Sequence, residues 1–261
     1  MPAYAMQARE LNGRFPYVAT GGGPPLIVLP GLSRDSEIRD AKAYRPLAAV
    51  TQRTVYVVAR PRELRRGITM RALAAIHAAA LQEQFGRQLD VLGISTGGAI
   101  ALQLAVDYPD LVGRLVVVAA ASWLGDAGRA KLREYGKRIE NGLSGAGILA
   151  SVLAPPWLRF PAMLAIRLEE FSQRHIDPAN MLATIDAECD FDVRNRLGEI
   201  KAHTLVIGGS RDRAFSTELF RSTAAGILGA RLILYPGRGH VGTMLDPRFG
   251  RDVAAFLGGQ A

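Results

Sequence analysis

The sequence predicts an α/β fold in which helices cover both faces of a mostly parallel sheet. Short runs of apolar, β-branched residues recur along the chain, and turn-forming residues end each of them. These runs lack the polar alternation of a half-exposed strand, as expected for central strands that are covered on both faces. Segments with helical periodicity separate most of the runs, and this alternation favours right-handed crossovers between parallel strands.

Six strands and four helices are expected on this basis. The strands are the runs that begin at Leu26, Thr54, Leu89, Leu115, Thr204 and Arg231. The helices span residues 69–85, 96–108, 217–227 and 247–257. Pro109 ends the second helix, and Pro247 falls in the first turn of the last one, where a missing N–H costs least.

The strand signal disappears between residues 122 and 199. This segment has helical patterns that glycines and prolines interrupt, and it is far longer than an ordinary connection between neighbouring elements. We therefore predict a core of residues 1–121 and 200–261, and a helical cap of residues 122–199 that returns the chain to the sheet.

Composition limits the class of protein. The chain has 261 residues, 49% of them hydrophobic, yet no apolar run is long enough to span a bilayer and no secretory pattern opens the sequence. The single cysteine, Cys189, cannot form an internal disulfide and is expected to be a small packing residue. The net charge of +8 comes from scattered arginines rather than from a basic stripe. We expect a cytoplasmic protein with no membrane and no nucleic-acid partner.

The segment Gly93-Ile94-Ser95-Thr96-Gly97 matches the pattern G-x-S-x-G, with an expected strand before it and an expected helix after it. A sharp turn at this point lifts the serine hydroxyl clear of the sheet edge and leaves the serine in a strained backbone conformation. Glycines on both sides let the strand and the helix approach without Cβ clashes. Ser95 is therefore a candidate nucleophile.

A serine hydroxyl needs a neighbouring base to take its proton. His240 lies in a glycine-rich loop after the last expected strand, which is the same sheet edge as Ser95. His77 lies on the apolar face of a helix and is expected in the core, His203 begins a strand at the opposite edge, and His175 belongs to the predicted cap. His240 is thus the candidate base.

Two aspartates could orient that base, because each follows the end of a strand. Asp212 follows the strand that begins at Thr204, and Asp126 lies where the chain enters the predicted cap. We favour Asp212. An oxyanion hole also requires backbone N–H donors. Thr96, at a helix N-terminus directly after the serine, would supply one, and Leu32, in the loop after the first expected strand, would supply the other.

Ser95, Asp212 and His240, in this order along the chain, together with the Pro30-Gly31 loop, resemble the α/β-hydrolase fold superfamily, and especially its compact, capped esterases, lactonases and C–C-bond hydrolases. The resemblance implies an eight-stranded, mostly parallel sheet with the cap inserted after the sixth strand. It also implies a serine-hydrolase mechanism with no metal and no organic cofactor. Many relatives carry His-Gly in place of Pro30-Gly31, and a histidine is common where Ile94 stands.

The function implied by this resemblance is hydrolysis of an ester-type bond in a small, largely apolar molecule through an acyl-enzyme. The apolar residues of segment 154–171 are expected to roof a pocket above the serine, and substrate contacts are expected from Trp123, Trp157, Phe160 and Met163. The alternatives are a C–C-bond hydrolase or a thioesterase on the same scaffold, or a weakly catalytic ligand receptor. The oligomeric state is left open, with a homodimer as one option.

Overall fold

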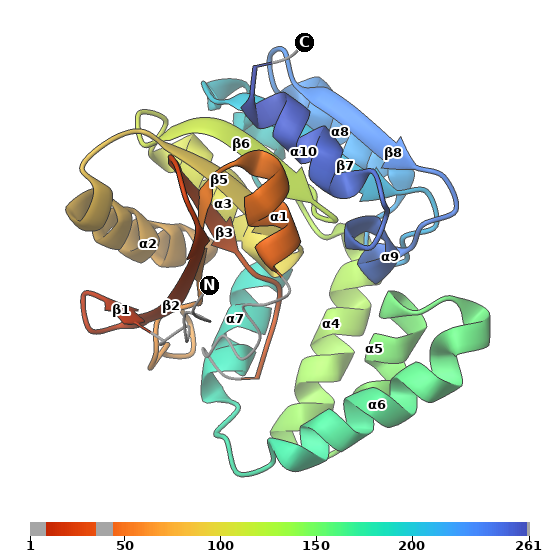
Figure 1. Ribbon diagram of the computed structural model, residues 1–261. Coiled ribbons are helices and arrows are strands. Elements are labelled where there is room, and N and C mark those ends of the chain that lie inside the picture. The colour runs from red at the N-terminus through yellow and green to blue at the C-terminus, as the bar shows by residue number, and fades with distance from the viewer. Residues whose placement is uncertain (1–8, 35–43, 260–261) are drawn as a thin grey trace, which may run out of the picture.

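The computed structural model in Figure 1 describes residues 9–34 and 44–259. Its centre is an eight-stranded sheet with the order β1-β2-β4-β3-β5-β6-β7-β8. The strands are β1 (Arg9–Leu11), β2 (Phe15–Gly21), β3 (Pro25–Leu29), β4 (Thr54–Val58), β5 (Leu89–Ile94), β6 (Val112–Val118), β7 (His203–Gly209) and β8 (Arg231–Tyr235). The pairs β1–β2 and β2–β4 are antiparallel, and all the others are parallel.

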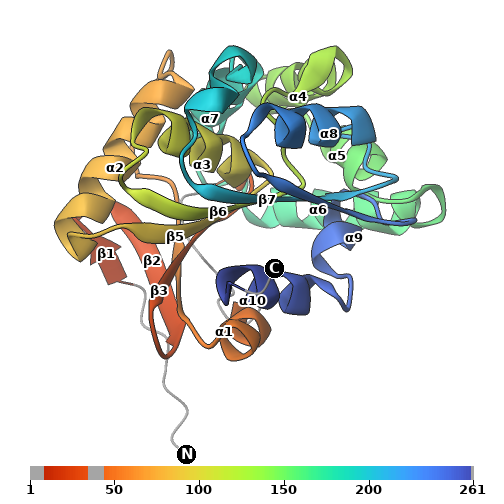
Figure 2. The same ribbon diagram turned by 90° about the horizontal axis from the view of Figure 1, so that it is seen from above.

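Helices cover both faces of this sheet (Figure 2). The helices of the core are α1 (Arg45–Thr51), α2 (Met70–Phe85), α3 (Thr96–Asp107), α8 (Thr217–Gly226), α9 (His240–Met244) and α10 (Phe249–Leu257). Helices α2, α3 and α8 pack on one face, and α1 and α10 pack together on the other. Every residue of β3 and β5 is buried, which explains why these strands are largely apolar in sequence.

The predicted fold class is confirmed, and all six predicted strands are present. The sequence reasoning did not locate β1, β2, α1 or α9 from their residues. The last predicted helix begins at Phe249 rather than at Pro247. These differences leave the parallel centre of the sheet unchanged, and that centre positions the site.

The chain leaves the sheet after β6, its sixth strand, and returns at β7. Between them lie α4 (Gly125–Glu140), α5 (Ala146–Leu153), η2 (Pro156–Leu158), α6 (Arg159–Ser172), α7 (Ala179–Cys189) and η3 (Arg194–Glu199). Helices α4 and α7 pack on each other through an apolar cluster that includes Tyr135, Met181 and Ile185. Ala183 and Ala187 of α7 belong instead to the main core, so α7 connects the cap to the body of the molecule.

The structure bears on two expectations from the sequence, the lack of a membrane-spanning segment and the packing role of Cys189. None of the helices in residues 9–34 and 44–259 is long and apolar enough to cross a bilayer. Cys189 is buried in the cluster between α4 and α7, and burial raises the pKa of its thiol to about 12. Its environment is that of a packing residue, as predicted.

Candidate active site

Ser95 lies in the turn between β5 and α3, with φ 53° and ψ −122°. A positive φ is strained for a residue with a side chain, and such strain persists only where the surroundings enforce it. Close packing around the turn provides this enforcement. A Cβ on Gly97 would lie 2.0 Å from the carbonyl oxygen of Leu29, and a Cβ on Gly93 would lie 2.4 Å from that of Gly97. Both glycines are therefore required sterically, as the motif predicts.

His240 lies between Ser95 and Asp212. Its Nε2 is 3.0 Å from the Ser95 Oγ, and its Nδ1 is 2.8 Å from the Asp212 Oδ2. Because a carboxylate only accepts, Nδ1 carries the proton in this contact, which leaves the lone pair of Nε2 facing the serine hydroxyl. The ring of Phe215 stacks on the imidazole at a centroid distance of 6.0 Å and fixes its plane. The geometry is that of a nucleophile, a base and an orienting acid.

The Asp212 carboxylate is fully buried, and both of its oxygens are in use. Oδ2 contacts His240, and Oδ1 accepts hydrogen bonds from the backbone N–H groups of Ala214 (2.8 Å) and Phe215 (3.1 Å). These bonds hold the carboxylate in one orientation. The alternative acid, Asp126, lies in the first turn of α4 and has no place in this arrangement.

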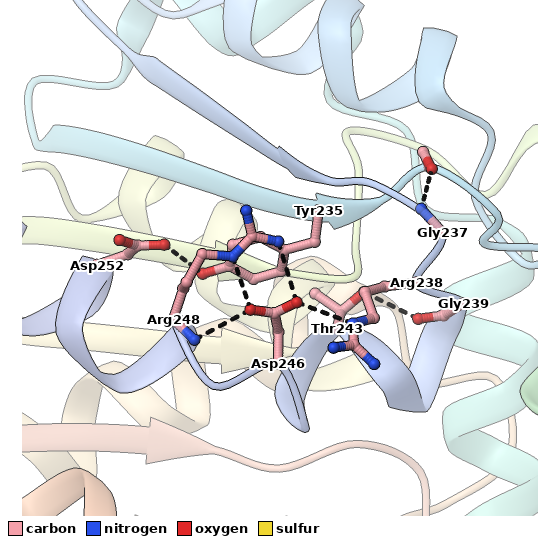
Figure 3. A network of polar contacts seen from close by, with 9 residues as sticks. Tyr235, Gly237, Arg238, Gly239, Thr243, Asp246, Arg248 and Asp252 are labelled. Carbon is pink, nitrogen blue, oxygen red and sulfur yellow. Dashed lines mark hydrogen bonds and ion pairs between the residues drawn. The ribbon is translucent and has the colours of Figure 1, made fainter.

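A polar network holds the loop and short helix that carry His240 (Figure 3). At its centre is the buried Asp246, which accepts hydrogen bonds from the Arg248 Nε (2.9 Å) and the Arg238 Nε (2.8 Å). These guanidinium groups, Arg248 above all, hold the pKa of Asp246 well below its usual range. Since Arg238 precedes His240 and Asp246 follows it, their contact closes the segment on itself. The network therefore fixes the backbone from which the imidazole projects.

Leu32 and Thr96, the predicted oxyanion donors, both line the cavity next to Ser95. Thr96 is the first residue of α3, where N–H groups have no partner within the helix and the helix dipole favours negative charge. The loop that carries Leu32 passes close to the serine, because a Cβ on Gly31 would lie 3.5 Å from the Ser95 Cβ. The Leu32 side chain packs against the cluster between α4 and α7, which ties this loop to the cap.

Glu188 is a site residue that the sequence reasoning missed. It lies near the end of α7, is 4% exposed and lines the cavity, and its Oε2 accepts a hydrogen bond of 2.7 Å from the Thr96 Oγ1. Burial raises the pKa of this carboxyl, although the Thr96 hydrogen bond opposes the effect. The available signal was helical spacing, since position 188 falls on the same buried face of α7 as Met181, Thr184 and Ile185.

Arg60 was also missed. It lies two residues after the end of β4, at the carboxyl edge of the sheet, and is 3% exposed. Its guanidinium donates to the carbonyl oxygen of Ser33 (2.7 Å) and to the Asn180 Oδ1 of α7 (3.3 Å). A buried arginine with these partners links the loop of Leu32 to the cap. Its position after a strand was a usable signal, because ligand sites in α/β folds form at that edge.

The cavity above Ser95 has a volume of about 370 Å³. Its apolar wall comes from α4 and α5, with Leu132, Ile148, Leu149, Val152 and Leu153. Polar side chains also line it, among them Lys131 and Glu169. Within the described residues, His, Cys, Asp and Glu side chains form no group of three or more that could hold a metal ion.

The predicted substrate-contact residues do not line this cavity. Trp157 and Phe160 are 70% and 71% exposed and face away from it, because α6 turns its other side inward. Met163 lies near α5, within 4.0 Å of the position of a Gly147 Cβ. Trp123 packs against Arg194, whose guanidinium lies 4.0 Å from the ring centroid. The cavity has an apolar wall, but the wall comes mainly from α4 and α5, and Ile166 is the apolar lining residue that segment 154–171 contributes. The four substrate contacts stay a prediction that the cavity lining does not support.

The three other histidines lie apart from Ser95, as predicted. His77 is buried in α2, where its Nδ1 is 2.8 Å from the Leu73 carbonyl oxygen, and burial lowers its pKa to about 4. His203 begins β7 and is exposed, at the opposite end of that strand from the Asp212 loop. His175 is exposed in the connection between α6 and α7.

Comparison with known proteins agrees with this geometry. A family model described as the alpha/beta hydrolase family matches residues 26–253. RutD of Rhizobium rhizogenes, provisionally named a carbamate hydrolase, is 31% identical to this chain over 179 residues. The match covers 65% of this chain and 67% of RutD. A Pseudomonas putida 2-hydroxy-6-oxononadienedioate/2-hydroxy-6-oxononatrienedioate hydrolase is 29% identical over 165 residues, 59% and 56% of the two chains. The enol-lactonase structure of Burkholderia xenovorans LB400 superposes with a TM-score of 0.76 at 20% identity, covering 97% of this chain and all of the other, and this likeness shows the fold alone.

Proposed function

Because the chain belongs to the alpha/beta hydrolase family, we propose that it is a serine hydrolase that cleaves an ester-type bond through an acyl-enzyme. The observation that carries this proposal is the continuous contact from the Ser95 hydroxyl through His240 to Asp212 at the floor of a cavity. In this role Ser95 attacks the carbonyl carbon while the His240 Nε2 takes the hydroxyl proton. Asp212 holds the imidazole and stabilises its positive charge.

The attack places a negative charge on the carbonyl oxygen. Backbone N–H groups of Leu32 and Thr96 would stabilise it, and the first turn of α3 adds its dipole. His240 then gives its proton to the leaving group, which departs and leaves the acyl chain on Ser95. A water molecule that His240 deprotonates releases the acid and restores the serine.

The lining of the cavity supports a small substrate with an apolar portion. A volume of about 370 Å³ falls in the range of small-molecule sites, and side chains of α4 and α5 form an aliphatic wall. Polar lining residues such as Lys131 and Glu188 would orient a polar substituent. If short and very polar esters proved consistently the best substrates, the apolar preference would be wrong.

The decisive experiment compares Ser95→Ala with Ser172→Ala, a control at an exposed serine of α6. Ser95→Ala should abolish turnover of a chain-length series of 4-nitrophenyl esters and labelling by a fluorophosphonate probe, with circular dichroism unchanged. Ser172→Ala should behave as the wild type. Full ester turnover in Ser95→Ala would refute the proposal.

A second candidate is cleavage of a carbon–carbon bond next to a carbonyl, which the similarity to the P. putida hydrolase favours. The same three side chains would serve this reaction. Product analysis on esters, thioesters, lactones and vinylogous diketones distinguishes the two candidates, because only the second releases a carboxylic acid together with a carbon-terminated fragment.

A further inference from the structure

Helix α6 lies at the outer edge of the cap (Figure 1). Its two sides carry different side chains. Ile166, Glu169, Glu170 and Gln173 face the cavity. The opposite side exposes Phe160, Leu164, Leu168 and Phe171, which recur every three or four residues, and Trp157 and Leu158 of η2 precede them. These six side chains, which we call the α6 outer face, are each 50–71% exposed.

Isolated apolar residues on a surface are normal, but six large apolar side chains exposed together on η2 and α6 are unusual. Packing in this molecule does not explain them, because α6 has no buried residue at all and contacts mainly α5 and η2. Nor do they line the substrate cavity. A surface of this kind marks a contact with another molecule.

The charges around the α6 outer face indicate the chemistry of that contact. Arg167 of α6 and Arg174, which follows the end of this helix, are both exposed, and neither forms a salt bridge with another described residue. The Arg174 guanidinium lies over the Phe171 ring, 4.1 Å from its centroid. The acidic residues of the helix, Glu169 and Glu170, face the cavity instead. The face thus combines aromatic and aliphatic side chains with two arginines that have no acidic partner among the described residues.

This combination is typical of a helix that lies in a lipid interface, where apolar side chains enter the acyl boundary and arginines contact phosphate groups. A second copy of the chain fits less well. In a symmetric α6–α6 contact Arg167, near the middle of the helix, would approach its own copy, and like charges at an interface are unfavourable. The chain as a whole carries a net charge of +8, which adds long-range attraction to an anionic surface.

We propose that the α6 outer face docks on the surface of an anionic phospholipid membrane, so that the cap rests against the bilayer. Such docking needs no membrane-spanning helix, but it departs from the expectation of no membrane partner that the sequence suggested. It places the outer wall of the substrate cavity at the lipid surface, where apolar molecules concentrate. The proposal does not depend on the hydrolase chemistry, since it concerns a surface outside the catalytic residues.

The test is co-sedimentation of the full chain with vesicles of phosphatidylcholine, with and without phosphatidylglycerol. We expect binding to the anionic vesicles that rising salt weakens. In a variant with Leu164→Ser and Leu168→Ser, binding should fall by at least about tenfold, because two leucines no longer enter the interface. The matched control carries Leu228→Ser and Leu245→Ser, at leucines that are 91% and 72% exposed elsewhere, and should bind as the wild type.

The charge requirement is tested in the same assay with Arg167→Gln against Arg251→Gln, an exposed arginine of α10. Only the first should weaken binding to anionic vesicles. Ser95→Ala should bind vesicles normally, which separates this inference from the proposed function. Absence of vesicle binding by the wild type, or equal binding to both lipid mixtures, would overturn the proposal. So would sedimentation of the wild type as a dimer that the two serine substitutions in α6 dissociate.

Discussion

Replacing His77 should change the acid stability of the protein and leave its chemistry intact. The side chain is 1% exposed, its ring packs edge-on against Phe15 at 4.9 Å, and its Nε2 has no hydrogen-bond partner among the described residues. Burial lowers its pKa from 6.5 to about 4. Between these values the unfolded chain binds a proton that the folded chain does not, so the free energy of unfolding falls as the pH falls below 6.5.

The pKa difference corresponds to a maximum of about 3 kcal/mol, reached below pH 4, and most of this loss is present at pH 4.5. His77→Leu removes the titrating group and keeps an apolar side chain in its place. We therefore expect the free energy of unfolding of the wild type to fall by about 2–3 kcal/mol more than that of this variant when urea unfolding is measured at pH 7.5 and then at pH 4.5. His175→Leu, at an exposed histidine, serves as the control and should follow the wild type. An equal loss in the wild type and His77→Leu would refute the reasoning.

Three other substitutions probe the site. Asp212→Asn keeps an acceptor for the loop amides but removes the charge that stabilises the imidazolium. The kcat for an ester should therefore fall by about 10³-fold to 10⁴-fold. A fall of less than tenfold would contradict the role assigned to Asp212. Glu188→Gln keeps an acceptor for Thr96 but cannot ionise. Burial raises the folded-state pKa of Glu188 above 4.5, so this variant should match the wild type in urea unfolding near about pH 4 and be more stable at higher pH. The opposite trend would show that burial does not disfavour the ionised form of Glu188. Gly97→Ala would place a Cβ 2.0 Å from a backbone oxygen of β3 and should cost about 3 kcal/mol or more in thermal or urea unfolding, whereas Gly22→Ala, with open space around it, should cost little.

The parallel centre of the fold could be predicted from the sequence because its strands are buried on both faces. Every residue of β3 and β5 is buried, so these strands stand out as largely apolar runs, interrupted in β5 by Asp90, which pairs with Arg53. The antiparallel edge could not be predicted in the same way. Strand β1 has three residues, and β2 carries Pro16 and loses its burial toward Gly21, so neither has a strong pattern of its own. Their pairing depends on the neighbouring β4, which is a tertiary effect.

The three side chains at the floor of the cavity were predictable because each follows a strand, and the carboxyl ends of parallel strands meet at one edge. The cavity wall was not, because helical spacing alone does not tell which side of a cap helix faces inward. Phe160 and Leu164 carry as strong an apolar pattern as Ile148 and Leu149, yet the first pair faces outward and the second lines the cavity. What decides between them is the packing of α5 and α6 on each other, which no local pattern records.

Helix α7 of the cap contacts residues next to Ser95, although the two lie far apart in the sequence. Glu188 accepts a hydrogen bond from Thr96, which follows Ser95, and Arg60 donates to both the loop of Leu32 and Asn180 of α7. The two proposed oxyanion donors are thus each connected to α7, one through a side chain and one through a bridging guanidinium. Since preorganised donors stabilise a developing charge best, the position of α7 would affect the reaction centre of the proposed mechanism directly. Among the described residues, α6 has no such link. The inner cap helix is therefore suited to hold the site, and the outer one is free to contact a second surface.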